Sequence, residues 1–114
     1  MLFRSPFMKN EIIVQKLAAY AEKIIRYCED TDYVRFSADS KLVEACVFNL
    51  SQMGELANRV DADYAQAHQQ VPWRLLYGLR NRIVHDYEGV NLQLIWEIIE
   101  DDLPVLLAEL TKLS

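Results

Sequence analysis

The sequence contains few of the residues that make turns and cross-links. Its 114 residues include only three glycines, three prolines and two cysteines. So few turn-forming residues leave little material for the many turns of an all-β fold. Two cysteines cannot form a disulfide framework or a four-cysteine zinc site. No apolar run approaches the roughly 20 residues of a membrane-spanning helix, and the first ten residues lack the pattern of a secretory signal.

Length and composition predict one globular domain in the cytoplasm. A chain of this size can bury roughly 65% of the surface that its unfolded state exposes. Hydrophobic residues make up 52% of the chain and charged residues 25%, which is ordinary for a folded protein. We expect a single domain over residues 1–114, with residues 1–7 as a candidate extension because Met8 could also be the start.

Charge is distributed unevenly along the chain. The formal net charge is −5, whereas a wholly non-specific nucleic-acid binder is usually basic. Residues 1–85 carry 11 Lys and Arg against 10 Asp and Glu, while residues 86–114 carry one Lys against seven acids. Within 73–85 there are three arginines (74, 80 and 82) and no acid. This stretch is either a local cationic site or a helix face with solvated arginines.

Apolar residues recur at helical spacing through most of the chain. The pattern predicts a helix from Ile12 to about Glu29 and another from Ser37 or Asp39, either of which could be the cap, to about Val60. The polar segment 61–70 is expected to make one or two helical turns. The next two helices are predicted from Pro72 to 85–87, with Gly89 as a stop signal, and from the N-cap Asn91 to the C-terminus.

Individual residues inside these helices predict local geometry. Gly54 costs about 1 kcal/mol of helix propensity relative to Ala, and close approach of another backbone is the usual reason for such a glycine. Pro104 predicts a kink in the last helix. Cys28 and Cys46 lie in apolar stripes and are interpreted as small buried residues.

Together these segments predict an all-α fold, an antiparallel up-and-down bundle of four main helices plus a short helix. Leu79 or Arg80 and Ile95 or Trp96 are alternatives for the inner faces of the last two helices. A bundle of this size often pairs with a second copy through its helices, so we expect a homodimer and no membrane contact.

The segment 80–87, RNRIVHDY, gathers chemically active side chains at the end of a predicted helix. Asn81 and Arg82 precede His85 by four and three residues and so lie closest to it on a helix. Arg80 precedes His85 by five residues, an offset of about 140°. A long arginine side chain, an unwound last turn or a symmetric neighbour would be needed to bring Arg80 and His85 together.

These residue types suit cleavage of RNA without a metal ion. The reaction needs a base for the 2′-hydroxyl, an acid for the leaving oxygen and a cation for the phosphate; histidine suits the proton transfers and arginine the phosphate. Two copies of His85 in one dimer cleft would supply both the base and the acid. Alternatively, Arg80 and Arg82 pair with acids of the last helix while His85 caps its own helix. The other histidine, His68, is interpreted as a plain surface residue.

Recognisable metal and cofactor motifs are missing from the sequence. There is no HExxH, CxxC, Gly-rich phosphate loop or GxSxG element. We therefore expect neither a metal nor a cofactor.

The segment RNRIVHDY, the preceding Pro72–Trp73 and the following VNLQLIWEIIEDDLP resemble the HepT-like branch of the HEPN domains. The segment 49–58 (NLSQMGELAN) is similar to that family's second helix. The resemblance runs from about Met8 to Leu113. It implies a dimeric helical bundle that acts as a metal-independent endoribonuclease, the toxin of a toxin–antitoxin pair related to type VII. The implied partners are RNA and a minimal nucleotidyltransferase antitoxin.

Carried over by position, Arg80 and His85 match the catalytic residues of the motif, and Asn81 matches the polar residue that commonly follows the arginine. Tyr87 matches the tyrosine that the antitoxin modifies with AMP from ATP; without the resemblance, it would be interpreted as a partly buried anchor. Arg82 is a supporting candidate because of its charge and its spacing from His85. Glu55 could orient an active-site arginine or be an ordinary surface acid, and it is assigned no role.

Two other functions use the same residues differently. The chain could be a non-catalytic subunit that positions substrate or nucleotide for a partner nucleotidyltransferase. It could also be a purely structural dimer, although that leaves the acid-free stretch 73–85 without a purpose. Loss of RNA cleavage in a His85→Ala variant would separate the nuclease from both.

Overall fold

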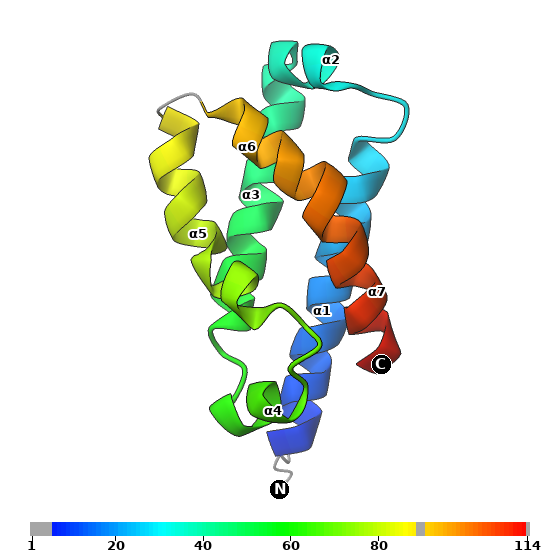
Figure 1. The fold of residues 1–114 in the computed structure, drawn as a ribbon, viewed down its shortest axis with the longest axis vertical. Helices are drawn as coiled ribbons and strands as arrows, with labels where there is room; N and C mark the ends of the chain where they lie inside the picture. Colours follow the sequence, from blue (N-terminus) through cyan, green and yellow to red (C-terminus); the bar gives the residue numbers. More distant parts are fainter. Residues whose placement is uncertain (1–5, 89–90, 114) are drawn as a thin grey trace, which may run out of the picture.

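Four helical arms form an up-and-down bundle in which each arm runs antiparallel to the one before it (Figure 1). The structure, a computed structural model, describes residues 6–88 and 91–113, with the side chains of 9–83 and 91–113. The first three arms are α1 (Pro6–Tyr27), α3 (Ser40–Ala57) and α5 (Trp73–Glu88); the fourth joins α6 (Leu92–Glu97), the π-helix η1 (Ile98–Asp102) and α7 (Leu103–Leu113). Two short helices, α2 (Tyr33–Ala38) and α4 (Ala62–Ala67), lie in the connections.

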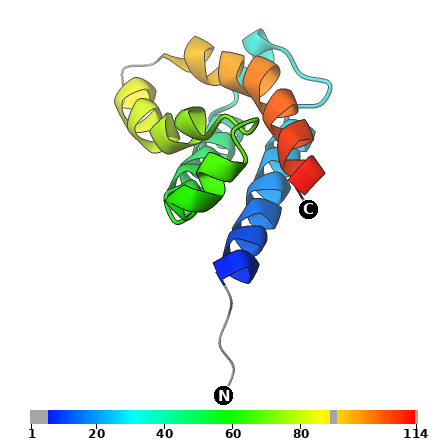
Figure 2. The same ribbon diagram turned by 60° about the horizontal axis from the view of Figure 1, so that its bottom comes forward.

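The arms pack so that α3 lies between α1 and α5, while α7 lies against α1 (Figure 2). The short helix α2 packs against α3 and α6, and α6 also contacts α5. The predicted all-α bundle of four main helices is confirmed. No helix within residues 6–88 and 91–113 is long and apolar enough to cross a membrane.

The apolar stripes of the four arms meet in one hydrophobic core. The largest fully buried side chains come from every arm and from α2: Leu17, Ile24, Phe36, Leu50, Met53, Leu76, Leu79, Ile83, Ile95, Ile98, Leu103 and Leu106. Of the two alternatives for the inner face of α5, Leu79 is buried and Arg80 is exposed. In the last arm Ile95 is buried, whereas Trp96 is only partly buried and packs its ring 5.0 Å from that of Phe36.

The two cysteines are buried as predicted, and their sulfur atoms lie 3.7 Å apart as free thiols. The hydrogen bond between them and burial raise the pKa of the Cys46 thiol, so this group stays neutral. Cys28 closes α1 and Cys46 lies in the middle of α3, so the thiol pair is part of the contact between these two arms.

Helix α2 was not predicted, and only one short helix was expected where the structure has two. Its six residues bury a single side chain, Phe36, which is too little to form a recognisable stripe. Asp32 caps α2 by accepting a hydrogen bond from the amide of Arg35 at 2.9 Å. The first helix also begins earlier than predicted, at Pro6.

The cap of α3 is Asp39, one of the two predicted candidates, and its carboxylate accepts from the amide of Leu42 at 3.1 Å. Ser37, the other candidate, lies inside α2 and donates its hydroxyl to the carbonyl of Val34. Asn91 caps α6 as predicted by accepting from the amide of Leu94.

Pro104 predicted a kink in the last helix, and the structure has a π-helical turn, η1, directly before Leu103 and Pro104. The amide of Leu103 bonds the carbonyl of Ile98, five residues back, in place of the usual four. Proline has no amide hydrogen, and its ring crowds the carbonyl four residues before it, here that of Glu100. A wider turn relieves this crowding while Ile99 and Leu103 remain in the core.

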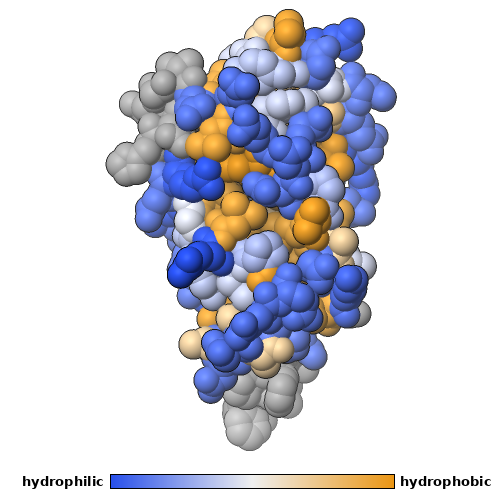
Figure 3. Space-filling view, in the orientation of Figure 1, coloured by the Kyte–Doolittle hydropathy of each residue, from blue (hydrophilic) through white to orange (hydrophobic). Residues whose placement is uncertain are grey.

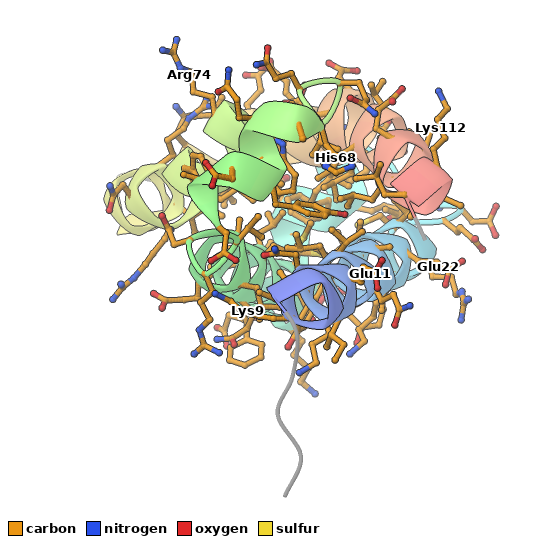
Figure 4. The ribbon with its side chains drawn as sticks, turned by 90° about the horizontal axis from the view of Figure 1, so that it is seen from below. Lys9, Glu11, Glu22, His68, Arg74 and Lys112 are labelled. Carbon is orange, nitrogen blue, oxygen red and sulfur yellow. The ribbon has the colours of Figure 1, made fainter. Side chains whose placement is uncertain are left out.

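Helix α4, which was predicted as a short helical stretch, is joined to α1 by polar contacts of its N-cap residue. The carboxylate of Asp61 accepts from Lys9 at 2.9 Å and from the buried Asn10 at 3.2 Å, and these bonds hold the pKa of Asp61 below its ordinary value. His68 is not a plain surface residue, which corrects the prediction: it is half-buried, and the centre of its ring lies 4.2 Å from that of the tilted Tyr64 ring. Figure 4 shows it among the side chains beneath α4. Its carbonyl accepts from the indole of Trp73 at the start of α5.

Helices α3 and α5 approach each other closely at Gly54, as its position inside a helix predicts. A β-carbon at Gly54 would lie 3.1 Å from the backbone nitrogen of Arg80 and 3.5 Å from the carbonyl oxygen of Leu76. These are main-chain atoms of a packed helix and cannot rotate aside. The hydrogen side chain of glycine is therefore what allows α5 to lie against α3 at this point.

We expect Gly54→Ala to destabilise the fold by about 1–3 kcal/mol, because overpacking against a backbone outweighs the roughly 1 kcal/mol gain in helix propensity. Urea unfolding would measure the change. Gly78→Ala is the matched control, since the nearest atom to its new β-carbon is Arg82 Cδ at 4.0 Å, and we expect it to be neutral or stabilising. Equal stability of the two variants would contradict the close-packing argument.

Candidate functional site

The central feature of the candidate site is an ion pair between α5 and α3. Arg80 Nη1 lies 2.6 Å from Glu55 Oε1, and the two side chains are 62% and 45% exposed. Glu55 follows Gly54, so the close contact of the two helices brings these side chains together. An exposed pair of this kind contributes only about 0–1 kcal/mol to stability, so Arg80 can leave Glu55 for a stronger anionic partner.

The ion pair identifies a residue to which the sequence assigned no role. Of the two interpretations of Glu55, orientation of an arginine is the one that the geometry supports. The alternative in which Arg80 pairs with an acid of the last helix is wrong, because its partner belongs to α3. The sequence signal for Glu55 was its place beside a helical glycine, but the identity of its partner depends on how α3 and α5 cross.

Of the other candidates on α5, the structure describes the side chains of Asn81 and Arg82 but only the backbone of His85 and Tyr87. Asn81 and Arg82 are exposed, and no carboxylate of 91–113 lies within 4.0 Å of the Arg82 guanidinium. The backbone of His85 and Tyr87 belongs to α5, but their side chains lie outside those that the structure describes, as does Gly89, the predicted stop. Arg74, earlier on the same helix, extends away from the bundle (Figure 4).

A groove of about 440 Å³ begins at Glu55 and runs between α1 and α3. Its polar lining comes from Lys16, Tyr20 and Lys23 of α1 and from Gln52, Glu55 and Arg59 of α3, and Ala19 and Leu56 complete it. The groove lies on the α1–α3 side of the bundle, whereas Figure 3 shows the face of α5, α6 and α7, where hydrophobic atoms show through among hydrophilic ones.

Among the residues that the structure describes, no group of three or more His, Cys, Asp or Glu side chains is arranged to hold a metal ion. The groove and the ion pair share one acid, Glu55, which lines the groove and holds Arg80.

The fold and this arginine define a class of protein, an all-α bundle that presents an Arg-x4-His motif on its third arm. The model of one family, described as "Ribonuclease HepT-like", matches residues 17–113. The chain therefore belongs to the HepT-like family of HEPN domains, which confirms the resemblance seen in the sequence.

Relatives with similar sequences cover most of this chain. "Putative RNase MJ1380" of Methanocaldococcus jannaschii is 30% identical over 89 residues, 78% of this chain and 82% of the relative. "Putative RNase TTE0752" of Caldanaerobacter subterraneus is 32% identical over 94 residues, 76% of this chain and 84% of the relative. "Probable ribonuclease HepT" of Thermococcus cleftensis is 26% identical over 100 residues, 88% of this chain and 91% of the relative. No solved structure matches the chain.

We expect Arg80→Ala to change the free energy of unfolding by less than about 1 kcal/mol, because the ion pair is exposed and alanine keeps the β-carbon that packs on Gly54. Chemical denaturation would measure it beside Arg26→Ala, which breaks the exposed Arg26–Glu22 pair on α1. A loss above about 2 kcal/mol at Arg80 alone would make the pair a structural element rather than part of a site.

Proposed function

We propose that this chain is a metal-independent endoribonuclease in which Arg80 and His85 are the catalytic residues. The observation that carries the proposal is the placement of Arg80, which is exposed on α5 and paired with the half-exposed carboxylate of Glu55 at the edge of an open groove. The family, described as ribonuclease HepT-like, and the names of the relatives support RNA as the substrate.

The chemistry needs three groups at one phosphodiester. A neutral imidazole takes the proton of the 2′-hydroxyl, and the 2′-oxygen attacks phosphorus to form a 2′,3′-cyclic phosphate. An imidazolium gives its proton to the departing 5′-oxygen, which leaves as a hydroxyl. The guanidinium of Arg80 binds the non-bridging oxygens as charge builds on them, through paired charge-assisted hydrogen bonds.

A second copy of the chain would complete this site. Position 85 follows Arg80 by five residues in α5, an offset of about 140° on an ideal helix, and each chain has one His85. A twofold dimer supplies two copies of His85, one as base and one as acid, and two copies of Arg80. Asn81 and Arg82, both exposed, are supporting residues on the same helix.

Glu55 is a positioning residue in this proposal, since it acts through Arg80. It holds the guanidinium over the surface of α3 while the site is empty. A phosphate group can accept two parallel hydrogen bonds from the Arg80 guanidinium. Exchanging Glu55 for a phosphate costs little free energy, because the Arg80–Glu55 pair is exposed to solvent.

We further propose that the chain is the toxin of a toxin–antitoxin pair in the cytoplasm, silenced by a minimal nucleotidyltransferase that transfers AMP to Tyr87. The nucleotide would add a phosphodiester charge and a bulky base two residues after His85. It could then occupy the phosphate site and pair with Arg80 or Arg82. Silencing by modification needs no permanent complex with the antitoxin.

The proposed activity predicts cleavage of a mixed RNA pool by the purified wild-type protein in EDTA. His85→Ala should lower the rate by 100-fold or more, in the range of about 10²–10⁴ that general acid–base catalysis supplies. Arg80→Ala should also slow cleavage, while Arg26→Ala, which removes an exposed ion-paired arginine elsewhere, should not. Gel analysis with end-labelled RNA would follow the products.

Equal cleavage by wild type and His85→Ala would point to a contaminant or another site. Absence of cleavage in both, after mass spectrometry has shown no AMP on Tyr87, would contradict the nuclease and favour the non-catalytic binding subunit.

The proposed silencing predicts that Tyr87→Phe keeps its ribonuclease activity but resists the partner nucleotidyltransferase with ATP. Intact-mass measurement should show addition of AMP to the wild type and none to Tyr87→Phe. Unchanged incorporation of AMP into the variant would place the modification on another residue.

A further inference from the structure

The groove between α1 and α3 has positive charge on both of its walls. Lys16 and Lys23 stand on α1, seven residues and about 10 Å apart along the helix axis, and Arg59 stands just beyond the end of α3. Glu55 is the one acid in the lining, and it is already paired with Arg80. The groove is therefore cationic although the whole chain carries a net charge of −5.

The three cations are available to a ligand. Lys16, Lys23 and Arg59 are exposed, and no carboxylate among the described side chains lies within 4.0 Å of them. By contrast, Lys9, Arg26 and Lys112 all have acidic partners. Unpaired cations gathered in one hollow favour a polyanion as its occupant.

Aromatic rings accompany these charges. Tyr20 lines the groove, partly buried, with the ammonium of Lys23 5.6 Å from the centre of its ring. Phe48 is 60% exposed and precedes Gln52 by four residues, so it lies on the same face of α3 as the groove lining. A cationic channel with rings on which bases can stack is the common arrangement for binding a single strand.

The groove is continuous with the candidate active site. Glu55 belongs to its lining and also holds the guanidinium of Arg80. The motif arginine therefore lies one side chain away from the groove.

We propose that the α1–α3 groove binds the stretch of single-stranded RNA that flanks the phosphate held by Arg80. Lys16, Lys23 and Arg59 bind its backbone phosphates, and Tyr20 stacks on a base. This inference rests on the proposed ribonuclease function and assigns its substrate a path: unpaired RNA reaches Arg80 across α1 and α3.

A second copy of the chain fits this groove less well. Lysine is depleted in the buried centres of protein interfaces, and twofold packing of the groove on itself would bring like charges together. A nucleic-acid strand instead gains from every lysine and arginine that its phosphates meet.

The test is binding of a fluorescent 2′-O-methyl RNA of about 12 nucleotides, followed by anisotropy against salt concentration. This probe has no 2′-hydroxyl to attack, so binding is measured without cleavage. We expect Lys16→Ala, Lys23→Ala and Arg59→Ala each to weaken binding. Each should also reduce the slope of log affinity against log salt by about 0.7 for every phosphate that the variant no longer neutralises. Lys112→Ala on α7 is the matched control and should bind as the wild type does.

Stacking is tested separately from charge. Tyr20→Leu should weaken binding about fivefold or more with the salt slope unchanged, while Tyr20→Phe, which keeps the ring, should bind nearly as well as the wild type. Tyr33→Leu in α2 controls for removal of an exposed tyrosine away from the groove. Thermal unfolding of each variant separates weaker binding from weaker folding.

Binding that survives all the groove substitutions in folded protein would overturn the inference. So would a change of oligomeric state in these variants, measured by analytical ultracentrifugation, because the groove would then be an interface between copies. Failure of the ribonuclease proposal gives a different result: groove variants bind RNA weakly, but the wild type cleaves no RNA in EDTA.

Discussion

The close contact of α3 with α5 at Gly54 is the constraint on which the candidate site depends. The backbone nitrogen of Arg80 lies where a β-carbon at Gly54 would need room, so any larger residue would push the two arms apart. That contact fixes the part of α5 that carries Arg80 against the part of α3 that carries Glu55. A packing requirement in the core thus sets the geometry of a pair of charges on the surface.

The strength of the Arg80–Glu55 pair suits a site that must exchange partners. A buried ion pair would hold the arginine firmly, since breaking it would leave an uncompensated charge. This pair is half in solvent, so its contribution is small and a phosphate can compete for the guanidinium. The same exposure opens the arginine toward the cationic groove of α1 and α3. Folding and the proposed binding of a phosphate therefore make separate demands on Arg80.

The parts of the fold that were predictable are those that local patterns encode. Periodic apolar residues predicted the four arms, and the helical glycine predicted a close approach. Asn91 was predicted as a cap, and Asp39 was one of two candidates for another. Helix α2 escaped prediction because six residues with one buried side chain form no stripe. The contacts of His68 were also missed, because its ring lies against Tyr64 and its carbonyl accepts from the Trp73 indole within a polar segment that shows no apolar stripe.

The sequence by itself determined the class of fold, the family and the candidate site residues of the RNRIVHDY motif, because helix periodicity and this motif are contained in short stretches of chain. Only the tertiary structure decided which acid Arg80 meets and that Lys16, Lys23 and Arg59 share one groove. The lysines of α1, the groove residues Glu55 and Arg59 at the end of α3, and Arg80 of α5 come from three separate parts of the chain. Their proximity follows from how the arms cross, which no local pattern records.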